Sequence, residues 1–86
     1  IQRAAVSVMS NLAEGFEHTH LAEKLQFYKV ARASGAEVRS LLYVVEDNFS
    51  THREASAKLR QEAERTGQLV SGLIRSTEKR RCGPVE

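Results

Sequence analysis

The feature that most constrains this chain is a long apolar stripe at helical spacing between residues 21 and 45. Its members recur at steps of three and four residues, which places them on one helix face; they are Leu21, Leu25, Tyr28, Ala31, Gly35, Val38, Leu42 and Val45. The only proline is Pro84, so no residue before it forces a helix to break. The pattern predicts a helix over residues 20–46.

The apolar face of this helix is wider than a small bundle needs. Five more residues lie beside the stripe and extend it over more than half of the circumference: Phe27, Val30, Ser34, Leu41 and Val44. We therefore predict that these five residues form an interface with a second copy of the chain. Gly35 lowers helix propensity, and we attribute its presence to close approach by a neighbouring helix.

A shorter amphipathic pattern precedes the long one. Ile1, Ala5, Val8, Leu12 and Phe16 follow each other at steps of 4, 3, 4 and 4, which predicts a helix over residues 1–14. Gly15 stands where a left-handed C-terminal cap would end that helix.

A third helix is predicted over residues 52–80. Thr51 and Glu54 have the spacing of a capping box at its start. Its first half is rich in charge and poor in apolar residues, so we expect that half to be solvent-facing or frayed. Residues 69–74 are expected to provide most of its packing, and residues 81–86 are expected to form a disordered tail.

These elements predict an all-α chain with one domain over residues 1–86. Connections of about five residues force neighbouring helices to run antiparallel, which makes the architecture an up-and-down bundle. The single Cys82 has no intrachain disulfide partner, so we expect a reducing, cytoplasmic location. No signal peptide pattern and no run of 18 apolar residues occurs, so no membrane partner is expected.

Three stretches of the chain resemble a known family. The first runs from Arg3 to Phe16, the second covers residues 23–42 with Phe27, Ala31, Ser34 and Glu37, and the third covers residues 71–74. Together they are similar to the bacterial four-helix-bundle proteins named after 23S rRNA intervening sequences. Glu14, Gly15 and Phe16 close the first and longest of these motifs.

The resemblance implies a four-helix up-and-down bundle that assembles as a ring, typically a homopentamer, without catalytic activity. Distant relatives are accessory proteins of diversity-generating retroelements, which associate with a reverse transcriptase and with nucleic acid. The family's first helix would precede Ile1, so three helices are expected to leave a groove along their apolar stripes. His20 replaces the family's usual Ser cap, and Thr19 is the alternative cap.

No candidate catalytic or metal site emerges from the spacing of reactive residues. His18 and His20 do not have the i, i+4 spacing of two ligands on one helix, and we interpret them and His52 as solvated histidines. Asn11 and Glu14 are interpreted as a hydrogen-bonded clamp near Gly15. We therefore expect no metal, no cofactor and no enzymatic activity.

Basic residues are unevenly distributed along the chain. Residues 1–49 contain five Lys or Arg and six Asp or Glu, whereas residues 50–86 contain eight and five. Basic stripes of this kind can contact phosphates, so seven residues are predicted to bind nucleic acid: Lys29, Arg32, Arg39, Arg75, Lys79, Arg80 and Arg81. The alternative is that they keep the helix surfaces hydrated, with Glu54 and Lys58 forming a stabilising i, i+4 pair.

Two hypotheses about function follow from these observations. The first is a non-catalytic, homo-oligomeric scaffold or accessory factor that binds RNA or DNA, or a nucleic-acid-processing protein, through its basic edges. The alternative is a protein-interaction module whose open apolar groove accepts a helix from a partner. The absence of any recognition-helix, zinc-finger or aromatic base-stacking pattern means that nucleic-acid contact would be independent of base sequence.

Overall fold

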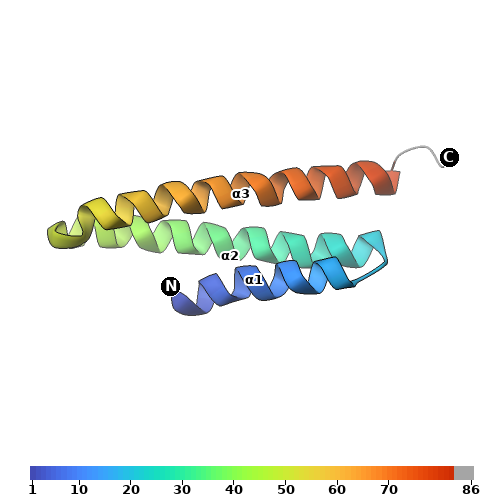
Figure 1. Ribbon diagram of the computed structural model, residues 1–86, viewed down its shortest axis with the longest axis horizontal. Coiled ribbons are helices and arrows are strands. Elements are labelled where there is room, and N and C mark those ends of the chain that lie inside the picture. Colours follow the sequence, from blue (N-terminus) through green and yellow to red (C-terminus); the bar gives the residue numbers. More distant parts are fainter. Residues whose placement is uncertain (83–86) are drawn as a thin grey trace.

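The computed structural model describes residues 1–82 and confirms that the chain is all-α. Three α-helices follow one another: α1 spans Gln2–Glu17, α2 spans Leu21–Asn48 and α3 spans Arg53–Cys82. A 3-10 turn, η1, spans Ser50–His52 between the last two helices. No strand occurs within residues 1–82. Figure 1 shows the three helices side by side, with α2 in the middle.

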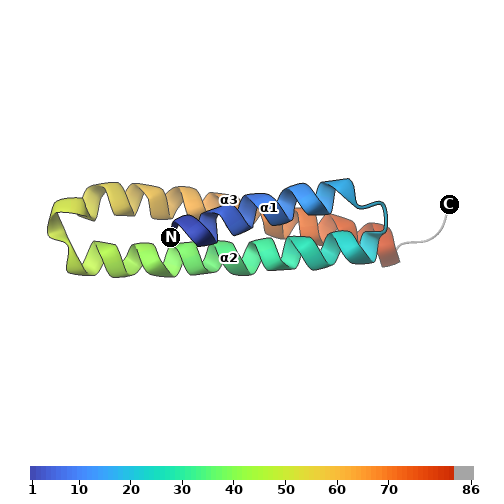
Figure 2. The same ribbon diagram turned by 90° about the horizontal axis from the view of Figure 1, so that it is seen from below.

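The central helix α2 organises the molecule. Both α1 and α3 pack along α2, whereas their backbones do not approach each other. The molecule is long and thin, with extents of 55, 20 and 12 Å. Figure 2 shows α1 and α3 displaced to the same side of α2. The result is a shallow V with α2 at its base, open between α1 and α3.

The core lies on the seam of α2 with α3, near the start of α2. Leu25, Tyr28 and Ala31 of α2 pack against Val70 and Ile74 of α3. Two partly buried leucines, Leu12 of α1 and Leu73 of α3, complete this cluster. The α2 members recur at steps of three residues and the α3 members at a step of four, which is the stripe that one helix face presents to another.

The C-terminal end of α1 differs from its prediction. The helix continues to Glu17 instead of ending at residue 14, and no glycine within residues 1–82 has a positive φ. Gly15 is therefore not a left-handed cap. It is buried inside the helix against the ring of Tyr28, so its missing side chain serves close packing.

Within the chain, Gly35 does not have the close packing predicted for it. A Cβ at Gly35 would meet only Cγ2 of Val8, at the ordinary contact distance of 3.9 Å. The packing of α1 against α2 therefore does not require glycine at this position. Glycine at position 15, where a Cβ would overlap the Tyr28 ring, is the one that close packing explains.

The predictions for helix starts and for α3 also need correction. His20 is the N-cap residue of α2, and neither it nor Thr19 caps the helix through its side chain. The first half of α3 is helical from Arg53 onward and mostly exposed, so of the two predicted alternatives it is solvent-facing and not frayed. Leu69 is 70% exposed, so it does not pack as predicted, whereas Val70 and Ile74 do. Arg81 and Cys82 belong to α3, and the remainder of the predicted tail, residues 83–86, lies outside the described residues.

Candidate nucleic-acid interface

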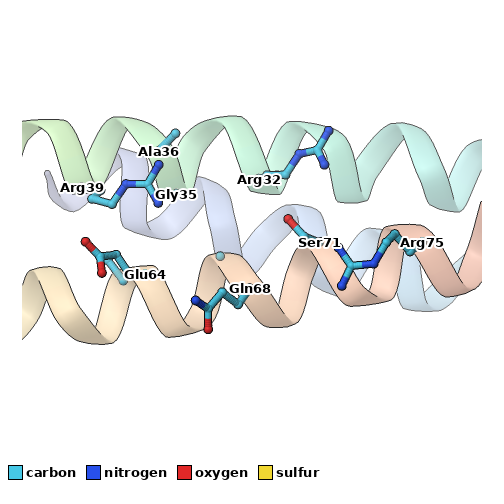
Figure 3. A pocket seen from close by; sticks show the side chains of 10 residues that line it. Arg32, Gly35, Ala36, Arg39, Glu64, Gln68, Ser71 and Arg75 are labelled. Atoms are coloured by element: carbon cyan, nitrogen blue, oxygen red, sulfur yellow. The ribbon is translucent and has the colours of Figure 1, made fainter.

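Three of the predicted basic residues meet in one groove on the seam between α2 and α3. Arg32 and Arg39 reach it from α2, and Arg75 reaches it from α3 (Figure 3). We call this site the arginine groove; it has a volume of about 540 Å³, and no residue of α1 lines it. The sequence could predict that Arg32 and Arg39 share an edge, because seven residues are two helical turns.

The antiparallel register of α2 and α3 brings Arg75 to this place. Lys29 of α2 lies 3.8 Å from Glu78 of α3, and Glu46 of α2 lies 3.0 Å from Arg60 of α3. Between these two ion pairs, Arg32 and Arg75 come level with one another, as Figure 3 shows. Arg39 lies about 10 Å further along the axis of α2. The three guanidinium groups thus follow the direction of the groove.

Small side chains form much of the groove between the arginines. They come from both helices and leave the backbone accessible; they are Gly35, Ala36, Ala63, Gly67 and Ser71. Gln68 and Glu64 add an amide and a carboxylate from α3. No aromatic residue from the described part of the chain, residues 1–82, lines the groove, so base stacking is not available there. Such a surface fits a phosphate backbone rather than the face of a base.

The groove is positively charged. Within residues 1–82, no carboxylate lies within 4.0 Å of the guanidinium groups of Arg32, Arg39 or Arg75. Among residues 1–82, Glu64 is the only acidic residue that lines the groove, and its carboxylate lies 3.3 Å from Nη1 of Arg60. Guanidinium groups without a carboxylate partner are available to bind a phosphate in the bidentate manner that arginine favours.

The other four predicted nucleic-acid-binding residues do not line the arginine groove. Lys79 lies next to its Arg75 end, in a shallow depression with Arg75, Ser76 and Glu78. Lys29 is paired with Glu78. Arg80 lies near Tyr28: burial raises the pKa of the Tyr28 hydroxyl, and the charge of Arg80 offsets part of that rise.

Arg81, the last of the four, is exposed in the final turn of α3. Of the seven predicted residues, three therefore line the arginine groove and the other four lie outside it. The ion pairs within residues 1–82 also do not include the predicted pair of Glu54 and Lys58.

The five residues predicted to form an oligomer interface separate into two groups. Phe27 stacks on His18, with ring centroids 4.9 Å apart, and the hydroxyls of Ser34 and Ser7 are hydrogen-bonded at 2.8 Å. Both residues therefore serve the packing of α2 against α1 and its connection. Val30, Leu41 and Val44 remain 40%, 37% and 54% exposed, so these three are available for contact with another molecule.

A second hollow, the apolar trough, lies on the open side of the V. Its volume is about 230 Å³, and it is lined from all three helices by Ala5, Val8, Met9, Gly35, Val38, Ala63 and Thr66. Met9, one of these residues, is 66% exposed. A large apolar side chain exposed at a hollow of this kind is available for contact with another element.

Among the residues considered for chemistry, His18 and Asn11 have side-chain partners, whereas His20 and His52 are exposed as predicted. His18 lies 3.7 Å from Glu14 and 3.6 Å from Glu23, in the connection between α1 and α2. Asn11 donates to the backbone carbonyl and the hydroxyl of Ser7 rather than clamping Gly15. Within residues 1–82 no group of three His, Cys, Asp or Glu side chains is arranged to hold a metal ion.

A polar cluster centred on Arg60 lies outside the sites predicted from the sequence. Its guanidinium donates to Glu46, to Glu64 and to the Tyr43 hydroxyl, and lies 4.4 Å from the centre of the Tyr43 ring. The hydrogen bond to Glu46 raises the pKa of Arg60. The i, i+4 spacing of Arg60 and Glu64 could have predicted their ion pair. The bonds from Arg60 to Glu46 and Tyr43 of α2 could not be predicted in this way, because they depend on the register between the two helices.

Comparison with known proteins identifies one family. The family described as 23S rRNA-intervening sequence protein matches residues 1–72. No curated protein and no solved structure matches the chain. In the part of the chain that the structure describes, no helix has the combination of length and hydropathy that crossing a bilayer requires.

Proposed function

We propose that this chain, which belongs to the 23S rRNA-intervening sequence protein family, is a non-catalytic accessory subunit that binds the phosphate backbone of RNA or DNA in its arginine groove. The observation that carries the proposal is the convergence of Arg32, Arg39 and Arg75 from two helices. Each arginine adds a phosphate contact without reading bases, so binding is independent of sequence.

The charge balance of the groove supports this proposal over simple surface hydration. Arginines that only keep a surface wet need not gather in one concave place, and their side chains commonly pair with nearby carboxylates. Here three guanidinium groups face a single acidic residue, Glu64, which is already held by Arg60. A polyanion that enters the groove therefore finds cations on both walls.

Self-assembly is part of the proposal, because a chain with three groove arginines binds weakly alone. A homo-oligomer, and specifically a pentameric ring, would repeat the arginine groove on each subunit and multiply the affinity. The exposed apolar residues Val30, Leu41 and Val44 on α2 support contact between copies. Light scattering of the native particle tests this part, and a monomer at all concentrations would contradict it.

The test of nucleic-acid binding is a salt titration with labelled RNA and DNA oligonucleotides. We expect the logarithm of the binding constant to fall linearly with the logarithm of the salt concentration. The steepness of this line should decrease by about 2 to 3 when Arg32, Arg39 and Arg75 are changed to Ala together. The matched control changes three exposed cations outside the groove to Ala: Arg3, Lys58 and Arg65. Equal losses in both variants would show that net charge, not the groove, governs binding.

A second candidate function is the binding of an amphipathic helix in the apolar trough. The specific observation is the mainly apolar lining of that hollow, in which Met9 is 66% exposed. A fourth helix laid between α1 and α3 would cover this surface and complete a bundle.

This second candidate is tested with Met9→Ser. We expect this variant to bind less of a dye that reports exposed apolar surface, and to lose the stabilisation that an added amphipathic helical peptide gives the unaltered chain. Leu69→Ser is the matched control, because Leu69 is similarly exposed but is not among the residues that line the trough. If peptides stabilise neither the unaltered chain nor the control, the trough is not a helix-binding site.

A further inference from the structure

We infer that Arg60 is a positioning residue for the arginine groove: it neutralises Glu64 and so keeps the neighbouring Arg39 free for phosphate. This inference rests on the proposed function, since it concerns the same groove. It assigns a role to Glu64, which lines the groove, and to Arg60, which is not among the described residues that line it.

The carboxylate of Glu64 is placed where it could oppose binding. Glu64 lines the groove with Arg39, and Figure 3 shows its side chain extending from α3 toward α2 on the Arg39 side. A free carboxylate there would attract the Arg39 guanidinium and repel an incoming phosphate, and both effects lower affinity.

Arg60 is held so that it can neutralise this carboxylate. Its Nη1 lies 3.3 Å from Oε1 of Glu64, and its Nε lies 3.0 Å from Oε2 of Glu46 on the other helix. The Tyr43 hydroxyl, 3.2 Å from Nη1, and the Tyr43 ring fix the guanidinium further. With so many partners, Arg60 cannot easily move away from Glu64, whereas Arg39 has no carboxylate within 4.0 Å in residues 1–82.

The arrangement predicts coupling between Arg60 and Glu64 in nucleic-acid binding. Glu64→Gln removes a carboxylate that Arg60 already neutralises, so we expect it to change the affinity for a labelled oligouridylate less than Arg60→Gln does. Arg60→Gln releases Glu64, and we expect a loss of affinity that is about threefold larger in the otherwise unaltered chain than in a chain that already carries Glu64→Gln. Loss of the Arg60 charge alone would act equally in both backgrounds.

The experiment is a double-mutant cycle on the full chain, with binding measured by fluorescence anisotropy at one fixed salt concentration and helix content checked by circular dichroism. The Glu64→Gln variant keeps the Arg60 bond to Glu46, so it stays folded even if Arg60→Gln does not. A loss of affinity from Arg60→Gln that is larger in the otherwise unaltered chain than in the chain with Glu64→Gln supports the inference. Equal losses in the two chains overturn it.

The outcomes also separate this inference from the proposed function. If the unaltered chain does not bind the oligouridylate, or binds it equally well after the three groove arginines are replaced, the proposed function fails. If those replacements abolish binding but Glu64 and Arg60 act additively, the groove stands and only the positioning role of Arg60 is lost.

Discussion

The ring of Tyr28 occupies the space that a side chain at Gly15 would need. A Cβ on Gly15 would lie 2.8 Å from Cδ1 of Tyr28 and 3.2 Å from its Cζ. Because Tyr28 is also a member of the buried cluster with Val70 and Ile74, this contact links α1 to the core that α2 and α3 share. The packing of α1 against α2 therefore depends on the absence of a side chain at Gly15, in the last turn of α1.

Changing Gly15 to Ala should destabilise the protein even though Ala is the better helix former. Overpacking against a buried ring costs about 1–3 kcal/mol, which exceeds the gain of about 0.5–1 kcal/mol in helix propensity. Gly67→Ala is the matched control, since no atom lies within 4 Å of a Cβ there, and it should raise stability by about 0.5–1 kcal/mol. Urea unfolding measures both; a stabilised Gly15→Ala variant would refute the packing argument.

Lys24 should stabilise the C-terminal end of α1 from the neighbouring helix. Its Nζ donates to the carbonyl oxygens of Gly15 at 3.0 Å and of Phe16 at 3.3 Å, where the helix dipole favours a cation. We expect Lys24→Met, which keeps the aliphatic stem, to lower the free energy of unfolding by about 1 kcal/mol. Lys29→Met is the control, because its pair with Glu78 is half exposed and should contribute little. Equal effects would count against the capping role.

The stability of the protein should decline at alkaline pH, partly because of Tyr28. Burial raises the pKa of its hydroxyl in the folded state above the ordinary value of 10.0. The folded state therefore holds the proton more tightly than the unfolded chain, so this contribution is complete below pH 10.0 and is lost as pH rises through the folded-state pKa.

Replacing Tyr28 with Phe should reduce this alkaline loss of stability, whereas replacing the 45% exposed Tyr43 with Phe should leave that pH dependence in place. Thermal unfolding between about pH 8 and about pH 11 measures the two slopes. A slope that is the same in Tyr28→Phe as in the unaltered chain would assign the alkaline loss to other groups.

Ser34 and its exposed neighbours on α2 should respond differently to substitution. Ser34→Ala removes the hydrogen bond to Ser7, and we expect a loss of about 0.5–1.5 kcal/mol in stability with no change in particle mass. Val30, Leu41 and Val44 changed to Ser should reduce self-association while affecting the stability of a subunit little, because these side chains are already exposed. Light scattering and chemical unfolding of both variants distinguish the two roles.

Some of this structure follows from the sequence because helical periodicity is local. The stripe from Leu21 to Val45 predicts α2 to within two residues at each end, and the seven-residue spacing of Arg32 and Arg39 predicts their shared edge. The match of residues 1–72 to the family agrees with the resemblance that the first motif carries. In each case the evidence lies within a few turns of one helix.

The roles of Gly15 and Gly35 show where local evidence ends. Both are glycines in helices, and the sequence suggested a cap for one and close packing for the other. The structure gives the packing role to Gly15 and no cap to either, because what matters is the residue on the facing helix: the ring of Tyr28 for Gly15, and only Val8 at ordinary distance for Gly35. Likewise, Phe27 and Ser34 looked free for an interface until α1 was placed against them.

The sequence by itself determined the fold class, the three helices and the family of this protein, since each depends on spacing along the chain. The tertiary structure decided that Arg75 joins Arg32 and Arg39, and that Arg60 holds Glu64 beside them. Both arrangements depend on the register between the two antiparallel helices α2 and α3. That register is set by contacts between residues far apart in sequence, such as Lys29 with Glu78 and Glu46 with Arg60, which periodicity within one helix does not encode.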